Sequence, residues 1–147
     1  MEVLLDGQPL RLTAQQAIGK GGEADVYGVR GNLAVKIFKD PNHPDLQGNT
    51  LEQEAARRRL AEQQRKLPAF PKNLPKNIVV PEKLVTDQLG RRIVGYSMRR
   101  VTGAEPLVKY SDRSFRSQGI DGNEVVGLFQ QIHASVKGLH RAGVVIG

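Results

Sequence analysis

The sequence contains no cysteine and no tryptophan, and only 5% of its 147 residues are aromatic. The absence of cysteine excludes disulfides, thiolate chemistry and cysteine-ligated zinc. The low aromatic content leaves few side chains that could stack on nucleic-acid bases. No apolar run approaches the roughly 18 residues that a membrane-spanning helix needs. We therefore expect a soluble, cytoplasmic protein with no membrane partner.

Positive charge is what the sequence has in excess. Lysine and arginine number 22 against 15 acidic residues, for a net charge of +7, and this balance favours anionic partners such as ATP or nucleic acid. The charge is concentrated at residues 57–59, 65–66, 91–92 and 99–100. Because aromatic residues do not alternate with these charges, we interpret them as solvated surface, and a basic nucleic-acid-binding module is the last of our three hypotheses.

The three histidines do not suggest a metal centre. His43, His133 and His140 are too widely and irregularly spaced to form a ligand set, so we expect no metal to be bound by the histidines of this chain and assign no metal ligand.

Short apolar segments between turn residues predict a β-rich first half. Residues 3–5 and 10–12 are typical of a hairpin around Asp6-Gly7. The same reasoning predicts strands at 24–29, 33–38, 78–80, 84–86 and 92–101.

Two long helices are expected after this first half. Thr50 with Gln53 three residues later matches a capping box, which predicts a helix over 50–66. Asp121 with Glu124 predicts a second helix, to about residue 141, whose apolar residues follow the i, i+3, i+4 spacing of a core-facing helix. A short helix is expected within 111–119. The fold class predicted is α+β.

A glycine-rich turn followed by a lysine strand is the most informative feature. Residues 18–27 are Ile-Gly-Lys-Gly-Gly-Glu-Ala-Asp-Val-Tyr, and residues 33–37 are Leu-Ala-Val-Lys-Ile. Glycine has no Cβ, so backbone N–H groups in such a turn can approach a phosphate closely. A lysine in an apolar strand is costly to bury without an anionic partner. Together the two motifs predict a nucleotide-triphosphate site.

These motifs resemble the N-terminal lobe of the protein kinase fold, in a divergent, bacterial Ser/Thr kinase-like form. The turn matches the kinase pattern G-x-G-x-x-G-x-V with Ala24 in place of the third glycine, and 34–36 match the V-A-I-K strand. The resemblance covers roughly 14–147. It implies that residues 1–101 form a small lobe, with an antiparallel sheet and an αC-type helix. Residues 102–147 would form the hinge and the incomplete start of the large lobe, including C-lobe helices.

The resemblance also implies roles for individual residues. Lys36 would hold the α- and β-phosphates of ATP, aligned by a glutamate of the following helix. We choose Glu54 over Glu52, because Glu54 is nearer the usual separation and shares a helix side with Leu51 and Ala55 that we expect to face the sheet. The catalytic pair is then Lys36 and Glu54.

The remaining site residues would hold the nucleotide. Val26 and Ala34 would sandwich the adenine, Met98 would be the gatekeeper, and the backbones of Arg99 and Val101 would face the adenine edge. Glu23, at the tip of the turn, departs from the pattern, since a carboxylate there would repel phosphates unless it points outward. The implied ATP-binding set is Gly19, Lys20, Gly21, Gly22, Val26, Ala34, Lys36, Met98, Arg99 and Val101.

Residues 139–147 resemble the approach to the kinase catalytic loop, with Ile146 and Gly147 where His and Arg usually stand. The catalytic aspartate and the Mg²⁺ ligands would follow, so we expect a truncated domain that is inactive alone. The parent would transfer the γ-phosphoryl of ATP, with Mg²⁺, to a protein Ser or Thr. The second hypothesis is a pseudokinase or regulatory interaction domain. The apolar face of the 121–141 helix further predicts self-association.

Overall fold

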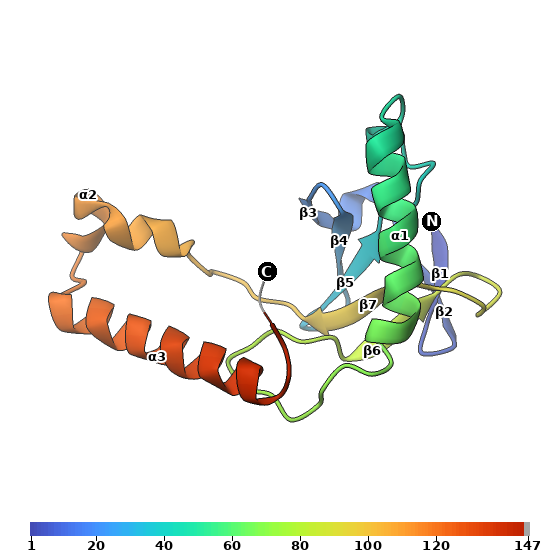
Figure 1. Ribbon diagram of the computed structural model, residues 1–147. Coiled ribbons are helices and arrows are strands. Elements are labelled where there is room, and N and C mark those ends of the chain that lie inside the picture. The colour runs from blue at the N-terminus through green and yellow to red at the C-terminus, as the bar shows by residue number, and fades with distance from the viewer. Residues whose placement is uncertain (146–147) are drawn as a thin grey trace. The chain divides into compact units, whose positions relative to one another are not determined.

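The computed structural model describes residues 1–145 and divides into two compact units (Figure 1). The first unit comprises Met1–Phe70 and Val79–Arg100, and the second comprises Pro71–Ile78 and Val101–Gly147. The boundary after Arg100 is one residue from the one expected after Val101. The connection after the first long helix belongs to the second unit, which the sequence did not indicate.

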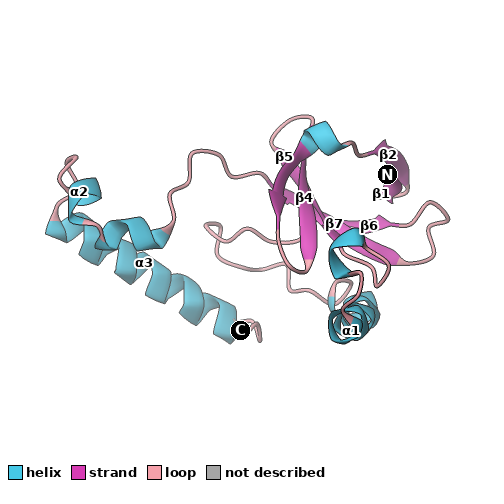
Figure 2. Ribbon diagram, turned by 90° about the horizontal axis from the view of Figure 1, so that it is seen from above, coloured by secondary structure: helices cyan, strands magenta, loops and turns pink. Residues whose placement is uncertain are grey.

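The first unit is built on a curled antiparallel sheet, shown in magenta in Figure 2. Its strands run in the order β2-β1-β6-β7-β5-β4-β3. The strands are β1 (Glu2–Leu5), β2 (Gln8–Arg11), β3 (Ala17–Lys20), β4 (Ala24–Val29), β5 (Leu33–Phe38), β6 (Lys83–Thr86) and β7 (Ile93–Arg99). This sheet, together with the helices, confirms the predicted α+β class. The strands expected at 24–29 and 33–38 have the observed bounds.

One expected strand is absent. Residues 78–80 form no strand, because the N–H of Ile78 closes a turn onto the C=O of Pro75 at 3.0 Å. Pro81 follows directly and has no N–H to donate to a ladder. The turn before this apolar run and the proline after it therefore prevent it from forming a strand.

The two long helices have close to their predicted bounds. The structure has α1 (Thr50–Lys66), α2 (Arg113–Arg116) and α3 (Gly122–Arg141), with 3₁₀ turns at Ala14–Gln16, Pro44–Leu46 and Leu107–Ser111. The capping box of α3 is confirmed, since Asp121 and Glu124 each accept a hydrogen bond from the other's N–H. The cap of α1 is Asn49 rather than Thr50, because the Asn49 amide oxygen accepts from the N–H of Glu52 at 3.1 Å.

The two faces of the sheet bury different clusters, since successive side chains of a strand point to opposite faces. Ile37 points to the face that the β1–β2 hairpin covers, and Phe38 points to the face on which α1 packs. Buried side chains of the first cluster are Val3, Leu12, Val35, Ile37 and Val85. The second cluster consists of Ala24, Phe38 and Leu67, packed against Leu60, Leu84, Ile93 and Tyr96.

Gln64 fastens α1 to the start of β7. Its Nε2 donates to the C=O of Leu60 at 2.9 Å and to the C=O of Ile93 at 2.8 Å, and its Oε1 accepts from the N–H of Ile93 at 2.8 Å. The amide therefore pairs with Ile93 as a neighbouring strand would. This contact sets the rotation of α1 about its axis.

The second unit joins the Pro71–Ile78 segment to α3. Gly138 lies so close to Pro75 that a Cβ there would come within 2.6 Å of the proline ring. Asn77 donates from its amide to the hydroxyl of Ser135, which is buried. Val126 and Phe129 of α3 are exposed, and the predicted self-association stays a prediction. None of the helices within residues 1–145 combines the length and apolarity required to cross a bilayer.

Candidate functional site

Strands β3, β4, β5 and β7 line an open cavity of about 450 Å³ on the α1 face of the sheet. Seven of the ten predicted ATP-binding residues are in its lining: Gly19, Lys20, Gly21, Gly22, Val26, Lys36 and Met98. Glu23, Ala24 and Tyr96 complete it. Residues that lie far apart in the sequence, from Gly19 in β3 to Met98 in β7, thus line the same cavity.

The glycine-rich loop is the turn of the β3–β4 hairpin. The N–H of Gly21 donates to the C=O of Ala24 at 2.9 Å, which closes the turn. The N–H of Lys39 donates to the C=O of Glu23 at 2.9 Å and holds the tip of the loop against the end of β5. A Cβ at Gly22 would meet no atom within 4 Å. The loop therefore has a fixed backbone and free space above it.

Lys36 lies on the sheet face that lines the cavity. Val26 of β4 and Tyr96 of β7 are its direct neighbours across the ladder, and paired residues point to the same face. Its Nζ is 6.0 Å from the centre of the Tyr96 ring. Within residues 1–145, Lys36 forms no ion pair with a carboxylate. This half-buried residue therefore has an aromatic neighbour but, among the described residues, no anionic partner, and a phosphate would supply one.

Tyr96 connects this cavity to the packing of α1. Its ring meets Phe38 edge to face, with the ring centres 6.0 Å apart. Burial raises the pKa of its hydroxyl above 10.0, so Tyr96 stays neutral at physiological pH. The sequence analysis did not select Tyr96. The period of the strand could have identified it, because it is two residues from Met98 and so shares its face.

The structure does not bring Glu54 to Lys36. The expectation that Leu51 and Glu54 face the sheet together with Ala55 is wrong for those two residues, because Leu51 is 77% exposed and Glu54 is exposed as well, whereas Ala55 is half-buried. The side of α1 that packs on the sheet is marked by Ala56, which is fully buried. Because α1 contains few apolar residues, its sequence did not indicate which side of the helix faces the sheet. Glu52, the other candidate, is also exposed.

Three further predicted residues lie outside the cavity lining. Ala34 is buried in β5, and Arg99 is exposed at the end of β7. Val101 is half exposed and belongs to the second unit. The predicted departure at Ile146 and Gly147 lies outside the described residues.

Glu23 has a partner that the sequence did not predict. Its Oε1 lies 3.0 Å from Nη2 of Arg59 on α1. The Arg59 side chain is only 18% exposed, so the interpretation of residues 57–59 as solvated surface is wrong for this arginine. The ion pair links the tip of the glycine-rich loop to the helix.

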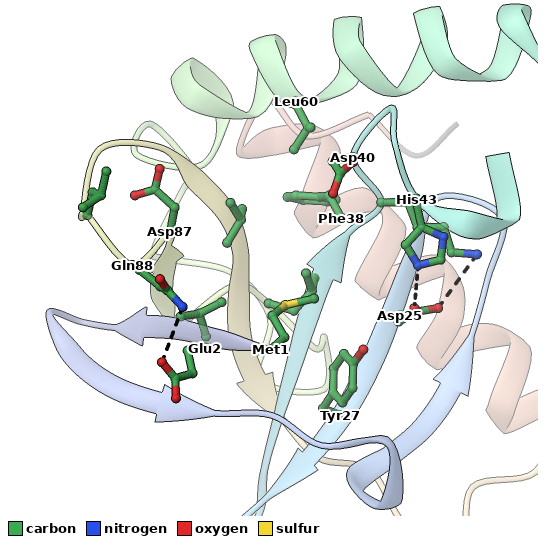
Figure 3. Close-up of a pocket in the computed structure, with 15 residues that line it drawn as sticks. Met1, Glu2, Asp25, Tyr27, Phe38, Asp40, His43, Leu60, Asp87 and Gln88 are labelled. Carbon is green, nitrogen blue, oxygen red and sulfur yellow. Dashed lines mark hydrogen bonds and ion pairs between the residues drawn. The ribbon is translucent and has the colours of Figure 1, made fainter. Parts of the chain in front are cut away.

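A second cavity, of about 420 Å³, is lined by residues of β1, β4 and β5 (Figure 3). At its edge Lys39 is 5% exposed and contacts Asp45 at 2.5 Å and Asp25 at 3.8 Å. His43 Nε2 lies 3.4 Å from the other oxygen of Asp25. The hydrogen bond from Lys39 lowers the pKa of Asp45. These ion pairs tie the loop after β5 to β4, so we assign the cluster a structural role, although the buried Oδ1 of Asp25 accepts no hydrogen bond within the described residues.

Comparison with known proteins adds no relative: the chain is matched by no protein-family model, no curated protein and no solved structure. The candidate function therefore depends on the geometry of the cavity and on the motifs that line it.

Proposed function

We propose that the first unit binds the triphosphate of ATP between the glycine-rich loop and Lys36, as the nucleotide-binding part of a protein Ser/Thr kinase-like protein. One observation carries the proposal. The loop glycines and two lysines, Lys20 and Lys36, line a single cavity, and Lys36 has no carboxylate partner within the described residues. Backbone amides and ammonium groups are the donors that phosphates require.

The order of elements supports the kinase-like part of the proposal. A strand, the glycine-rich turn, a strand, the lysine strand, a helix and two strands follow one another within the first unit. This is the order that the resemblance implies for a kinase small lobe. Val26 and Met98, two apolar residues of the lining, are suited to contact an adenine ring.

The residues fit the phosphates of ATP better than they fit Mg²⁺. No group of three His, Asp or Glu side chains within residues 1–145 is arranged to hold a metal ion. The one carboxylate in the cavity lining, Glu23, is paired with Arg59. We therefore assign no metal ligand and derive no step through Mg²⁺, and we expect no phosphoryl transfer by this chain alone.

A pseudokinase or regulatory interaction domain is the second candidate. It is favoured by the absence of a Lys36–carboxylate ion pair within the described residues, since in kinases that pair is part of the active arrangement. Such a domain would bind nucleotide without transferring phosphate. Measurable phosphoryl transfer by the purified chain would argue against this candidate.

Calorimetric titration with ATP tests the proposed function. We expect Lys36→Met to weaken binding by roughly tenfold or more, because a charge-assisted contact to phosphate contributes about 1.5–3 kcal/mol. Methionine keeps an apolar stem beside Tyr96. Lys66→Met is the matched control, because Lys66 is exposed on α1 and pairs with Glu62 outside the cavity. Equal affinities for the wild type and Lys36→Met would refute the proposal.

A further inference from the structure

The carboxylate of Glu23 is the one group in the cavity lining whose charge opposes phosphate binding. It shares the lining with Lys20 and Lys36. Like charges repel over the few ångströms of such a site, so an unrestrained carboxylate at the loop tip would cancel much of the attraction of one lysine. The chain therefore needs some means of controlling where this charge lies.

The backbone of Glu23 is fixed, but its side chain is not. Its C=O accepts the hydrogen bond from the Lys39 N–H at 2.9 Å, while 65% of its side chain is exposed. Rotation about the side-chain bonds could therefore carry the carboxylate toward or away from the cavity. Among the described residues, the ion pair that restrains it is the one with Arg59.

Arg59 is suited to act as that restraint. It lies in the interior of α1, and its side chain is 82% buried. Its position is set by the packing of the helix on the sheet, beside the fully buried Ala56. Because the guanidinium is held more firmly than the exposed carboxylate, the arginine determines the position of the pair.

We propose that Arg59 is a positioning residue for the phosphate site and acts through Glu23. The inference rests on the proposed function. Arg59 neutralises the Glu23 carboxylate and holds it against α1, so that phosphates in the cavity meet Lys20 and Lys36 without a competing negative charge. Without Arg59 the carboxylate is free to turn over the cavity, and the loss in affinity grows with the negative charge of the ligand.

Titrations with ATP and with adenosine, which has no phosphate, test this role. The variants are Arg59→Met, Glu23→Gln and the double variant. Arg58→Met is the matched control, because Arg58 is the exposed neighbour of Arg59 on α1. We expect Arg59→Met to weaken ATP binding by roughly fivefold and to leave adenosine binding unchanged, while Arg58→Met changes neither.

The double variant separates positioning from a direct contact or a structural effect. We expect Glu23→Gln to restore ATP affinity in the Arg59→Met background to within about twofold of the wild type. Glu23→Gln alone should have a smaller effect, because Arg59 already restrains the carboxylate. Failure of this rescue, or an equal loss for adenosine, would overturn the positioning role.

The proposed function and the role of Arg59 fail in different ways. If the wild type binds no ATP, the proposed function is wrong, and the role of Arg59 fails with it. If the wild type binds ATP with a dependence on Lys36 but not on Arg59, the function stands and only the positioning role is overturned.

Discussion

Gly95→Ala should strongly destabilise the first unit, because the centre of the sheet has no room for a Cβ at this position. Gly95 is buried in β7 and pairs with Ile37 on one side and Val85 on the other. A Cβ there would lie 2.1 Å from the backbone oxygen of Lys36 and 3.1 Å from Cδ1 of Ile37. To reach an ordinary contact of 3.4 Å, the strands would have to separate by about 1.3 Å.

The cost of that separation can be bounded. Overpacking of a core costs about 1–3 kcal/mol, and a backbone oxygen held in a ladder yields less easily than a side chain, so we expect about 3 kcal/mol. Small domains are stable by about 5–15 kcal/mol and have urea m-values of about 1–3 kcal/mol/M. The urea midpoint should therefore fall by about 1–3 M.

Urea unfolding followed by circular dichroism measures this shift. Gly22→Ala is the control, because its Cβ would meet no atom within 4 Å, and its midpoint should change little. The substitution should also affect the candidate site. Because it displaces the backbone of Lys36, we expect the Gly95→Ala variant to bind ATP more weakly than the wild type. A midpoint for Gly95→Ala equal to that of the wild type would show that the β5–β7 register is wrong.

Three further changes test other parts of the structure. Asp45→Asn should destabilise the chain at pH 7 but not in acid. The hydrogen bond from Lys39 lowers the pKa of Asp45 below its ordinary 3.8. The stabilisation of the fold by the Asp45 carboxylate is therefore present above pH 3.8 and is lost as the pH falls through the lowered pKa. Unfolding measured from pH 7 to pH 2 should show the difference disappear. Gln64→Ala should cost about 1–3 kcal/mol, because a backbone N–H and a C=O of β7 lose their partner. Gln63→Ala is its control, and equal costs would contradict the role of the amide. Gly127→Ala should stabilise α3 by about 1 kcal/mol, since its Cβ meets open space in a helix interior, which a rise in melting temperature would verify.

Local signals explain which elements could be predicted from the sequence. The capping box at Asp121 and the i, i+3, i+4 spacing after it depend on residues within one helix, and α3 begins and ends close to where they indicate. The strands at 24–29 and 33–38 follow the glycine turns at 21–22 and 31, and their observed limits agree with the expected ones. In contrast, the run at 78–80 failed as a strand, because the N–H of Ile78 closes a turn onto Pro75 and Pro81 has no N–H to donate to a ladder.

Part of the candidate site could likewise be predicted from local signals, and part could not. The convergence of the glycine-rich loop on Lys36 follows from a short hairpin and the strand beside it, which bring nearby residues onto one face. The expectation that α1 turns Glu54 toward the sheet was wrong, because α1 offers few apolar residues from which to determine its buried side. Ala56 and the Gln64 amide determine that side, and both act through contacts with the distant strands of the sheet.

By itself, the sequence determined the α+β class, the glycine-rich hairpin and the placement of Lys36 on the strand beside it, since strand period and turn chemistry are local properties. Only the tertiary structure decided the charges around that lysine. The rotation of α1 on the sheet leaves Glu54 exposed and brings Arg59 to Glu23, and the pairing of β5 with β7 gives Lys36 an aromatic neighbour in Tyr96. A helix with few apolar residues can pack on a sheet in several rotations about its axis that bury similar apolar area, and the contacts with the sheet select one of them.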